Sequence, residues 1–371
     1  MQAPARRLAL LAALCALTLT AGSALHAQDA AALQAWTATD GRVIQAKFVK
    51  LDGAAVVVEK DGRRFTVAFA KLSPACVALA RRLSLAGDAV PDGSALTPAA
   101  PVGFALIPAG AFTMGDTLDG DKDATPHQVT LTGFYMQINE VNQAQWNAVR
   151  TWGLKHGYAD LAVGTAKAAD HPVQSVSWYD IVKWCNAHSE KDGLTPCYST
   201  GGGVMRKGGS PPDCNWSATG YRLPTEAEWE KAARGGVSGK RFPWGDIITH
   251  AEANYGSDKS VIYDQSTTRG AHPIYNTGKP PFTSPGGKFP PNGYGLNDMA
   301  GNVGEWCWDW YGSYPSAEET DPRGASTGSC RVGRGGGWNN GAKSCRVAAR
   351  GFGTATNSGT VGFRTARSLA P

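Results

Sequence analysis

From residue 220 onward, the chain is a series of short glycine- and aromatic-rich blocks rather than a run of long periodic segments. The blocks are residues 220–230 (GYRLPTEAEWE), 242–245 (FPWG), 292–296 (NGYGL), 298–302 (DMAGN) and 334–338 (RGGGW). Glycine accounts for 46 of the 371 residues and there are 12 tryptophans, whereas glycine usually makes up ~7% of a protein. Such a pattern favours a globular fold in which long loops are anchored by aromatic side chains.

With residues 112–115 (FTMG) upstream and 361–364 (VGFR) at the end, the order and spacing of these blocks resemble the formylglycine-generating enzyme (sulfatase-modifying factor) family. The resemblance covers residues 103–367. It implies an α+β fold related to C-type lectins, with long irregular loops.

The N-terminus resembles a secretory signal peptide over residues 1–27, with Arg6 and Arg7 before an apolar run at 8–20 and a small-residue cleavage site at 25–27. The apolar run is shorter than the ~20 residues that span a bilayer. We therefore expect a secreted or periplasmic protein with no membrane span after cleavage. Loss of the two arginines lowers the formal charge from +5 to +3, which argues against a nucleic-acid partner.

Residues 34–83 predict a separate small β-meander or barrel, because Asp-Gly turn signals at 40–41, 52–53 and 61–62 separate alternating runs. This segment resembles the SLA1 homology 1 type of SH3-like domain. It is either a module that binds a peptide or partner, or a structural appendage. Residues 84–102, rich in Ala, Pro, Gly and Asp, predict a flexible linker.

In the large domain, we expect strands at residues 104–114 and 127–135 and a helix at 142–150. Ser177 and Thr225 each begin a capping-box pattern, which predicts two further helices. We expect Glu226, Glu228 and Glu230 to serve the cap and the helix dipole rather than act as general acids.

The resemblance implies a copper site formed by two closely spaced cysteines after an Arg-Gly-Gly-Ser segment. In this chain the first cysteine position is Asn340, the second is Cys345, and Gly337 takes the place of the serine. Cu(I) selects soft thiolate ligands, and an amide cannot replace a thiolate. The sequence thus offers Cys345 alone as a catalytic cysteine, and a structural or disulfide role suits it better.

A calcium site is implied by the same resemblance at Asp298, Gly301, Val303 and Glu305. Calcium takes about six to eight oxygen ligands, which carboxylates, backbone carbonyls and water can supply in a tight loop. The alternative is a turn whose two acidic residues are solvated or paired with arginine.

A second calcium site would begin at Asn254 and Tyr255. The position of its acidic partner falls near Lys279, and a lysine would repel the ion. Asp264 is the acidic residue that could substitute for it.

The sequence has eight cysteines, and removal of Cys15 with the signal peptide leaves an odd number in an oxidising compartment. Cys197 and Cys214 flank a glycine-rich segment, which suggests a disulfide at the base of a hairpin; two independent buried thiols are the alternative. The family bridge expected of Cys185 is absent, because Thr365 stands at the partner position. The partners of Cys76, Cys185, Cys307, Cys330 and Cys345 stay open.

The remaining polar residues give weaker indications. The histidines are scattered and predict no iron or zinc site. Arg346, Arg350 and Arg364 could bind an anionic ligand, although buried pairs with acids such as Glu228 or Glu305 suit them better.

These observations predict a calcium-stabilised binding or accessory module for a protein or peptide ligand, with a sulfatase-like client as one candidate. One alternative is an active oxidase that converts a sulfatase cysteine to formylglycine, or a related metal-dependent oxidase. Another is a ligand-binding protein diversified by a retroelement, in which Asn339, Asn340 and Asn357 would suit adenine-templated codons.

Overall fold

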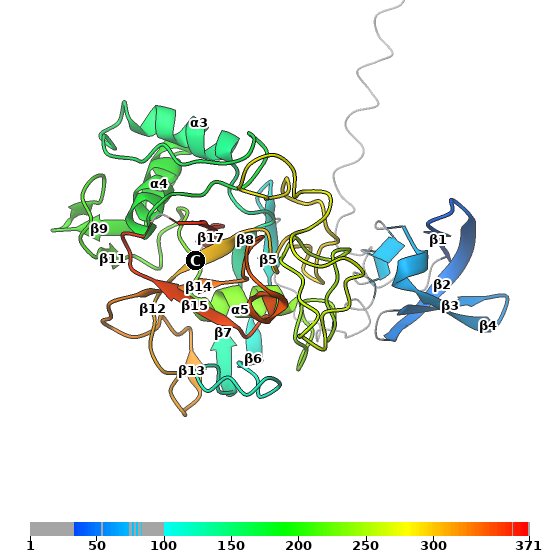
Figure 1. The fold of residues 1–371 in the computed structure, drawn as a ribbon. Helices are drawn as coiled ribbons and strands as arrows, with labels where there is room; N and C mark the ends of the chain where they lie inside the picture. The colour runs from blue at the N-terminus through cyan, green and yellow to red at the C-terminus, as the bar shows by residue number, and fades with distance from the viewer. Residues whose placement is uncertain are drawn as a thin grey trace, which may run out of the picture. The chain divides into compact units, whose positions relative to one another are not determined.

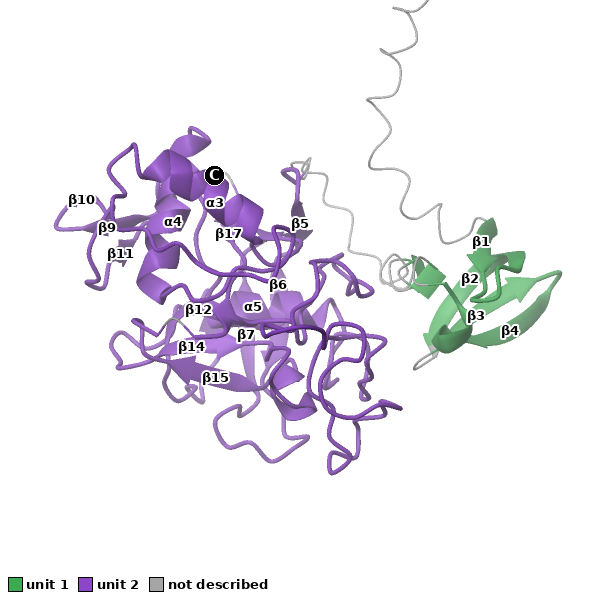
Figure 2. Ribbon diagram, turned by 45° about the horizontal axis from the view of Figure 1, so that its top comes forward, with its two compact units in different colours: residues 1–93 green, residues 94–371 purple. Residues whose placement is uncertain are grey.

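The computed structural model describes residues 33–369, except 53–54, 74–75, 78, 81–82, 84–99 and 358. The predicted signal peptide at 1–27 and residues 84–99 of the predicted linker lie outside this part of the chain. The chain divides into two compact units, residues 1–93 and 94–371 (Figure 2).

The N-terminal unit is an antiparallel meander with the strand order β1-β2-β3-β4. Its elements are β1 (Leu33–Thr37), β2 (Val43–Asp52), β3 (Ala55–Lys60), β4 (Arg63–Ala68) and the short 3-10 helix η1 (Phe69–Lys71). Asp61 and Gly62 both have positive φ, at 51° and 74°, which a two-residue type I′ hairpin requires. Trp36 is buried and its indole N–H donates to the Ala46 carbonyl at 2.9 Å. The resemblance to an SH3-like domain stays a prediction.

The large unit is sheet-rich with few helices (Figure 1). Its strands are β5 (Phe104–Ile107), β6 (Gly110–Met114), β7 (His127–Leu131), β8 (Phe134–Gln137), β9 (Tyr198–Thr200), β10 (Gly203–Val204), β11 (Asp213–Cys214), β12 (Gly304–Trp310), β13 (Glu319–Thr320), β14 (Arg331–Arg334), β15 (Arg350–Gly353), β16 (Val361–Gly362) and β17 (Ala366–Ser368). They form small sheets with the orders β17-β8-β5, β13-β7-β6, β10-β9-β11 and β15-β14-β12-β16. The helices are α3 (Gln143–Gly153), α4 (Trp178–Lys191), α5 (Glu226–Arg234) and the 3-10 helix η2 (Ala342–Cys345). Among the described residues, none of the helices has the length and apolar character needed to cross a membrane.

Two of the expected strands are each split in the structure. The prediction of one strand at 104–114 is wrong, because β5 pairs with β8 whereas β6 pairs with β7. Pro108 lies between β5 and β6 and has no N–H to donate to a ladder. The prediction of one strand at 127–135 is wrong in the same way. The N–H of Thr132, between β7 and β8, donates to the Asp321 carboxylate at 2.8 Å instead.

The helix starts follow their predicted caps. At α5, the Thr225 hydroxyl accepts from the Glu228 N–H at 3.2 Å, and the Glu228 carboxylate accepts from the Thr225 N–H at 2.8 Å. The same reciprocal pair joins Ser177 and Asp180 at the start of α4. These local hydrogen bonds satisfy backbone donors that the first turn of a helix leaves free.

The α5 helix lies buried against β6, β12 and β14 and carries three carboxylates into the core. Glu228 completes the cap and Glu226 also lies in the first turn, where a carboxylate favours the helix dipole. Glu230 lies beyond the first turn, so the expectation that it serves the helix start is wrong. Each glutamate also meets an arginine: Glu226 meets Arg350, Glu228 meets Arg222, and Glu230 meets Arg234 and Arg334. Buried carboxylates require such partners, and the pairs with Arg334 of β14 and Arg350 of β15 join these strands to the helix.

Candidate functional site

A groove with a volume of about 180 Å³ lies over β12, β14 and β15 in the large unit. Its lining includes Trp306, Asn340, Ser344, Phe352 and Asn357. We call it the Asn340 groove. Asn340, the first of the two predicted copper-ligand positions, lines this groove.

The floor of the groove is built by strand pairing and a glycine turn. Trp306 of β12 is paired with Gly333 of β14. The chain then turns through Gly335 and Gly336, whose φ values of 86° and 64° favour glycine. The Gly301 N–H donates to the Gly335 carbonyl at 2.8 Å, so the turn is held against the segment around residue 301.

The structure exposes one residue of the predicted copper pair and buries the other, with the Cys345 sulfur packed against Gly336, which lines the groove. Asn340 is exposed on the groove, whereas Cys345 is fully buried and belongs to an apolar cluster that includes Phe242 and Ile248. Burial raises the pKa of the Cys345 thiol to about 12. A thiolate is the form that binds copper, so this residue has the environment of a core cysteine.

The predicted calcium segment contains a network of carboxylates around one arginine. Both oxygens of Glu305 accept from Arg364, at 2.6 and 2.7 Å, and one also accepts from the Trp229 indole N–H at 2.8 Å. Asp298 accepts the Gly287 N–H at 2.7 Å through Oδ2, whereas its buried Oδ1 has no partner. Glu305 would therefore have to loosen its contact with Arg364 to bind a cation.

Glu140 completes this network, and the sequence analysis did not identify it. Its carboxylate accepts from the Val303 N–H at 3.0 Å and from the Asn302 side-chain amide at 2.6 Å. Burial, with Asp298 and Glu305 nearby, raises the pKa of Glu140 well above its usual range. Burial also raises the pKa of Asp298 to about 6. Three carboxylates thus face Arg364, and the unpartnered Oδ1 of Asp298 is the feature that fits a calcium ligand.

The consecutive residues Asn254 and Tyr255 of the second predicted calcium site contact different segments of the chain. Asn254 packs against the first segment: its carbonyl accepts the Asn302 N–H at 2.7 Å, and its buried side-chain Oδ1 has no partner. The Tyr255 hydroxyl instead donates to Asp264 at 2.6 Å, and Asp264 also contacts Arg269. Asp264 is thus fully engaged beside Tyr255. Among the described residues, no three His, Cys, Asp or Glu side chains form a group that could hold a metal ion.

The described cysteines are free thiols in the structure: Cys76, Cys185, Cys197, Cys214, Cys307, Cys330 and Cys345. Cys185 of α4 and Cys197 pack in one core cluster, and Cys214 packs against it. Burial raises the pKa of all three thiols, to about 11 for Cys197. The disulfide between Cys197 and Cys214 stays a prediction.

The arginines that could have bound an anionic ligand are engaged by carboxylates. Arg364 binds Glu305 and Arg350 binds Glu226, as buried pairs. Arg346 contacts Asp116, Asp119 and Asp121 in the loop after β6, rather than the glutamates that the sequence suggested.

Comparison with known proteins gives the family of the large unit. A profile described as sulfatase-modifying factor enzyme 1-like domain matches residues 95–369. The formylglycine-generating enzyme of Mus musculus is 34% identical over 318 residues, which cover 79% of this chain and 82% of that protein. The chaperone protein LppX of Paenibacillus barcinonensis is 33% identical over 253 residues, which cover 63% of this chain and 77% of LppX.

A solved structure with a similar fold is Treponema denticola variable protein 1, with a TM-score of 0.56 and 30% identity. The match covers 72% of this chain and 95% of that one. Together with the profile match over residues 95–369, these likenesses show that the chain belongs to the sulfatase-modifying factor enzyme 1-like family and is a homologue of the formylglycine-generating enzymes.

Proposed function

We propose that this family member is an exported binding or accessory module whose ligand surface is the Asn340 groove, and that it does not carry out copper-dependent oxidation. The burial of Cys345 in an apolar cluster is the observation that carries the proposal. With Asn340 at the other ligand position, the groove offers no thiolate pair for Cu(I).

The chemistry of the groove suits a protein or peptide ligand. Phe352 is 63% exposed, and the amides of Asn340 and Asn357 supply donors and acceptors, whereas Trp306 is 1% exposed and packs into the core beneath the groove. Aromatic side chains with adaptable amides are typical of recognition surfaces. The name of the homologue LppX, a chaperone protein, supports an accessory role beside the enzymatic one. A sulfatase-like client remains the first partner to test, because the mouse homologue is named for formylglycine generation.

The test is a formylglycine assay with two readouts. The mature protein is incubated with copper and a peptide that carries a Cys-x-Pro-x-Arg motif, and the products are analysed by mass spectrometry beside the mouse enzyme as positive control. We expect no conversion above a reaction without protein, while titration of the labelled peptide reports binding separately. Formylglycine above that background would refute the noncatalytic role.

Restoring one thiol provides a matched variant. Asn340→Cys alone should stay inactive, because Cys345 is enclosed in the core and Gly337 lacks the hydroxyl of the family serine. Activity of this variant would mean that Cys345 can reach the groove, and the burial argument would fail.

A retroelement-diversified binding protein is the second candidate. Asn340 and Asn357 come from different loops and line the same groove, and Asn339 is the neighbour of Asn340. The structural likeness to a Treponema denticola protein named variable protein 1 favours this class. A near-copy of the gene's 3′ end beside a reverse transcriptase gene would support it, whereas a neighbouring sulfatase gene would favour the oxidase alternative.

The N-terminal unit adds a second proposed module. We infer that residues 34–83 form an SH3-like domain that binds a partner or serves as an appendage, and that export follows removal of residues 1–27. The observed meander with its type I′ turn at Asp61 and Gly62 supports the first part. N-terminal sequencing of periplasmic protein would test the second, since it should begin at Gln28.

A further inference from the structure

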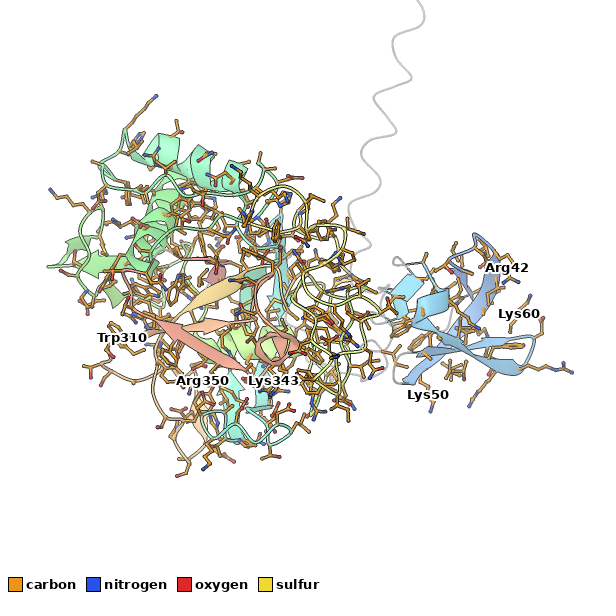
Figure 3. The ribbon with its side chains drawn as sticks, viewed as in Figure 1. Arg42, Lys50, Lys60, Trp310, Lys343 and Arg350 are labelled. Atoms are coloured by element: carbon orange, nitrogen blue, oxygen red, sulfur yellow. The ribbon has the colours of Figure 1, made fainter. Side chains whose placement is uncertain are left out.

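A second cavity in the large unit, with a volume of about 270 Å³, lies beside the start of α5 and the end of β12. It is lined by the acidic residues Glu226, Asp309 and Glu319, by His127, and by the aromatic rings of Trp310 and Tyr314. We call it the Asp309 cavity. Arg350 is the one lining residue that it shares with the Asn340 groove. Figure 3 labels Trp310 and Arg350.

One of the acidic residues is neutralised within the protein. Arg350 donates through Nε and Nη2 to the two oxygens of Glu226, at 2.7 and 2.8 Å, and the Tyr314 hydroxyl donates at 3.0 Å. The remaining Arg350 nitrogen donates to the carbonyls of Asp123 and Gly312. The charges of Glu226 and Arg350 therefore cancel, and neither is available to a ligand.

Asp309 differs from Glu226 because the arginine that acts on it, Arg331, does so only through longer-range electrostatics and forms no ion pair with it. Its residue is 3% exposed, and one carboxylate oxygen accepts the Glu226 N–H at 2.7 Å. Among the described residues, no Lys, Arg or His nitrogen forms an ion pair with it. Burial raises the pKa of Asp309 well above its usual range, and the neighbouring Glu226 and Glu228 raise it further. A nearby cation stabilises the ionised form of such a buried carboxylate.

His127 supplies an independent observation. Its Nδ1 lies 3.1 Å from the Thr125 carbonyl, which can only accept, so Nδ1 carries the proton of the neutral ring. Nε2 is then a bare acceptor; it is buried without a hydrogen-bond partner, on a side chain that is 4% exposed. The closest carboxylate oxygen, from Glu319, lies 3.9 Å away, beyond hydrogen-bond distance.

The acceptors around this cavity thus include the Nε2 of His127, the carboxylate of Glu319 and the carboxylate of Asp309, of which one oxygen already accepts the Glu226 N–H. Two aromatic rings stand beside them, and aromatic faces attract cations. We propose that the Asp309 cavity binds an organic cation, an ammonium or guanidinium group, which donates to these acceptors and rests against Trp310 and Tyr314. The cation belongs either to a small free amine or to a Lys or Arg side chain of a peptide. The volume of the cavity suits a group the size of one side chain.

Isothermal titration of the mature full-length protein tests this proposal. The probes are n-butylamine, n-butylguanidinium, and the N-acetylated, C-amidated peptides Gly-Ala-Lys-Ala-Gly and Gly-Ala-Arg-Ala-Gly, with citrulline in place of arginine as the control whose blocked ends and side chain carry no charge. We expect a cationic probe to bind, and the citrulline peptide to bind at least about tenfold more weakly, as loss of a charge-assisted hydrogen bond implies. Tighter binding of the peptides than of the small cations would identify a side chain as the source, and the reverse would identify a free amine.

Two variants locate the binding. Asp309→Asn keeps an oxygen for the Glu226 N–H but removes the charge, and should weaken cation binding by about tenfold. Glu319→Gln removes a partly exposed charge, should weaken it by a smaller factor, and covers the case in which Asp309→Asn fails to fold. Asp258→Asn, an exposed acid outside the cavity, should bind like the wild type.

Four results would overturn the proposal. The first three are no cation binding by folded wild-type protein at millimolar probe, equal binding of the arginine and citrulline peptides, and unchanged binding in both folded cavity variants. Displacement of the cation by Zn²⁺ at an equal concentration would point to a metal site and would also overturn it.

Discussion

Arg331 shows at the scale of one residue how this core accommodates charge. It is 2% exposed and forms no salt bridge among the described residues, and its guanidinium carbon lies 3.8 Å from the ring centre of Trp178 and 3.5 Å from that of Trp310. Burial lowers its pKa to about 10, so it is still charged at neutral pH. Stacking between two indole rings, a hydrogen bond to the Trp308 carbonyl and the longer-range attraction of Asp309 take the place of an ion pair.

This arrangement predicts an unusual order of mutant stabilities. Arg331→Lys should lower the free energy of unfolding by about 2 kcal/mol, the size of a desolvated cation–π contact, because an ammonium keeps the cost of burial but loses planar stacking. Arg331→Met should cost less than about 1 kcal/mol, since it fills similar space without a charge. Urea unfolding of both variants measures the order. If the lysine variant is the more stable, cation–π stacking does not hold this residue.

At the scale of elements, the features that depend on neighbours in sequence were predicted, and those that depend on distant partners were not. Thr225 and Glu228 are three residues apart and cap α5 as their pattern indicates. The central strand β12 reads GEWCWDW and has residues buried on both faces, so no period-two alternation reveals it. In β14, Arg331 and Arg334 are buried in a strand because their partners lie on other elements.

The hairpin that contains Cys197 and Cys214 gives a prediction for redox state. Cys214 is paired with Tyr198, and the Asn215 N–H donates to the Cys197 carbonyl at 2.8 Å. The two cysteines are thus offset by one position, which turns their side chains to opposite faces of the strand pair. A disulfide between them therefore requires a local change in the pleat. We expect Cys197–Cys214 in periplasmic protein, contributing roughly 3 kcal/mol for a loop of this size.

Nonreducing peptide mapping decides it, with Cys197→Ser as the variant that should lower the melting temperature. Cys185 packs in the same core cluster as Cys197 and is the competing partner. A bond between Cys185 and either residue, or full alkylation of all three thiols in unreduced protein, would contradict the predicted pairing.

At the scale of the whole molecule, the blocks along the sequence indicated the family, whereas the charge network that joins them could not be predicted. Glu140 comes from the segment after β8, Glu305 from β12 and Arg364 from the segment after β16, and no local pattern links them. The same holds for the Asp309 cavity, where His127 and Asp309 meet from β7 and β12. Such sites depend on tertiary contacts, which a single sequence does not display.

The charge excess of this network leads to the prediction for calcium. Glu140, Asp298 and Glu305 lie around Arg364, and a divalent cation at Asp298 would offset the surplus carboxylates. A ligand that binds only the folded state stabilises it by about 2.7 kcal/mol at a hundredfold excess over Kd. Thermal unfolding in calcium should therefore occur at a higher temperature than in chelator. Magnesium should substitute poorly, because it prefers a smaller octahedral shell and keeps its water.

The variants separate a calcium ligand from an arginine partner. Asp298→Ala should abolish the calcium response, and Asp258→Ala, an exposed acid elsewhere, should retain it. Glu305→Ala should also abolish it, with a larger loss of stability that calcium does not restore, since Arg364 is then left buried without its partner. If wild-type protein melts identically in calcium and in chelator, these carboxylates serve the arginine alone. In that case Glu140, whose pKa burial raises well above its usual range, balances the network by holding a proton.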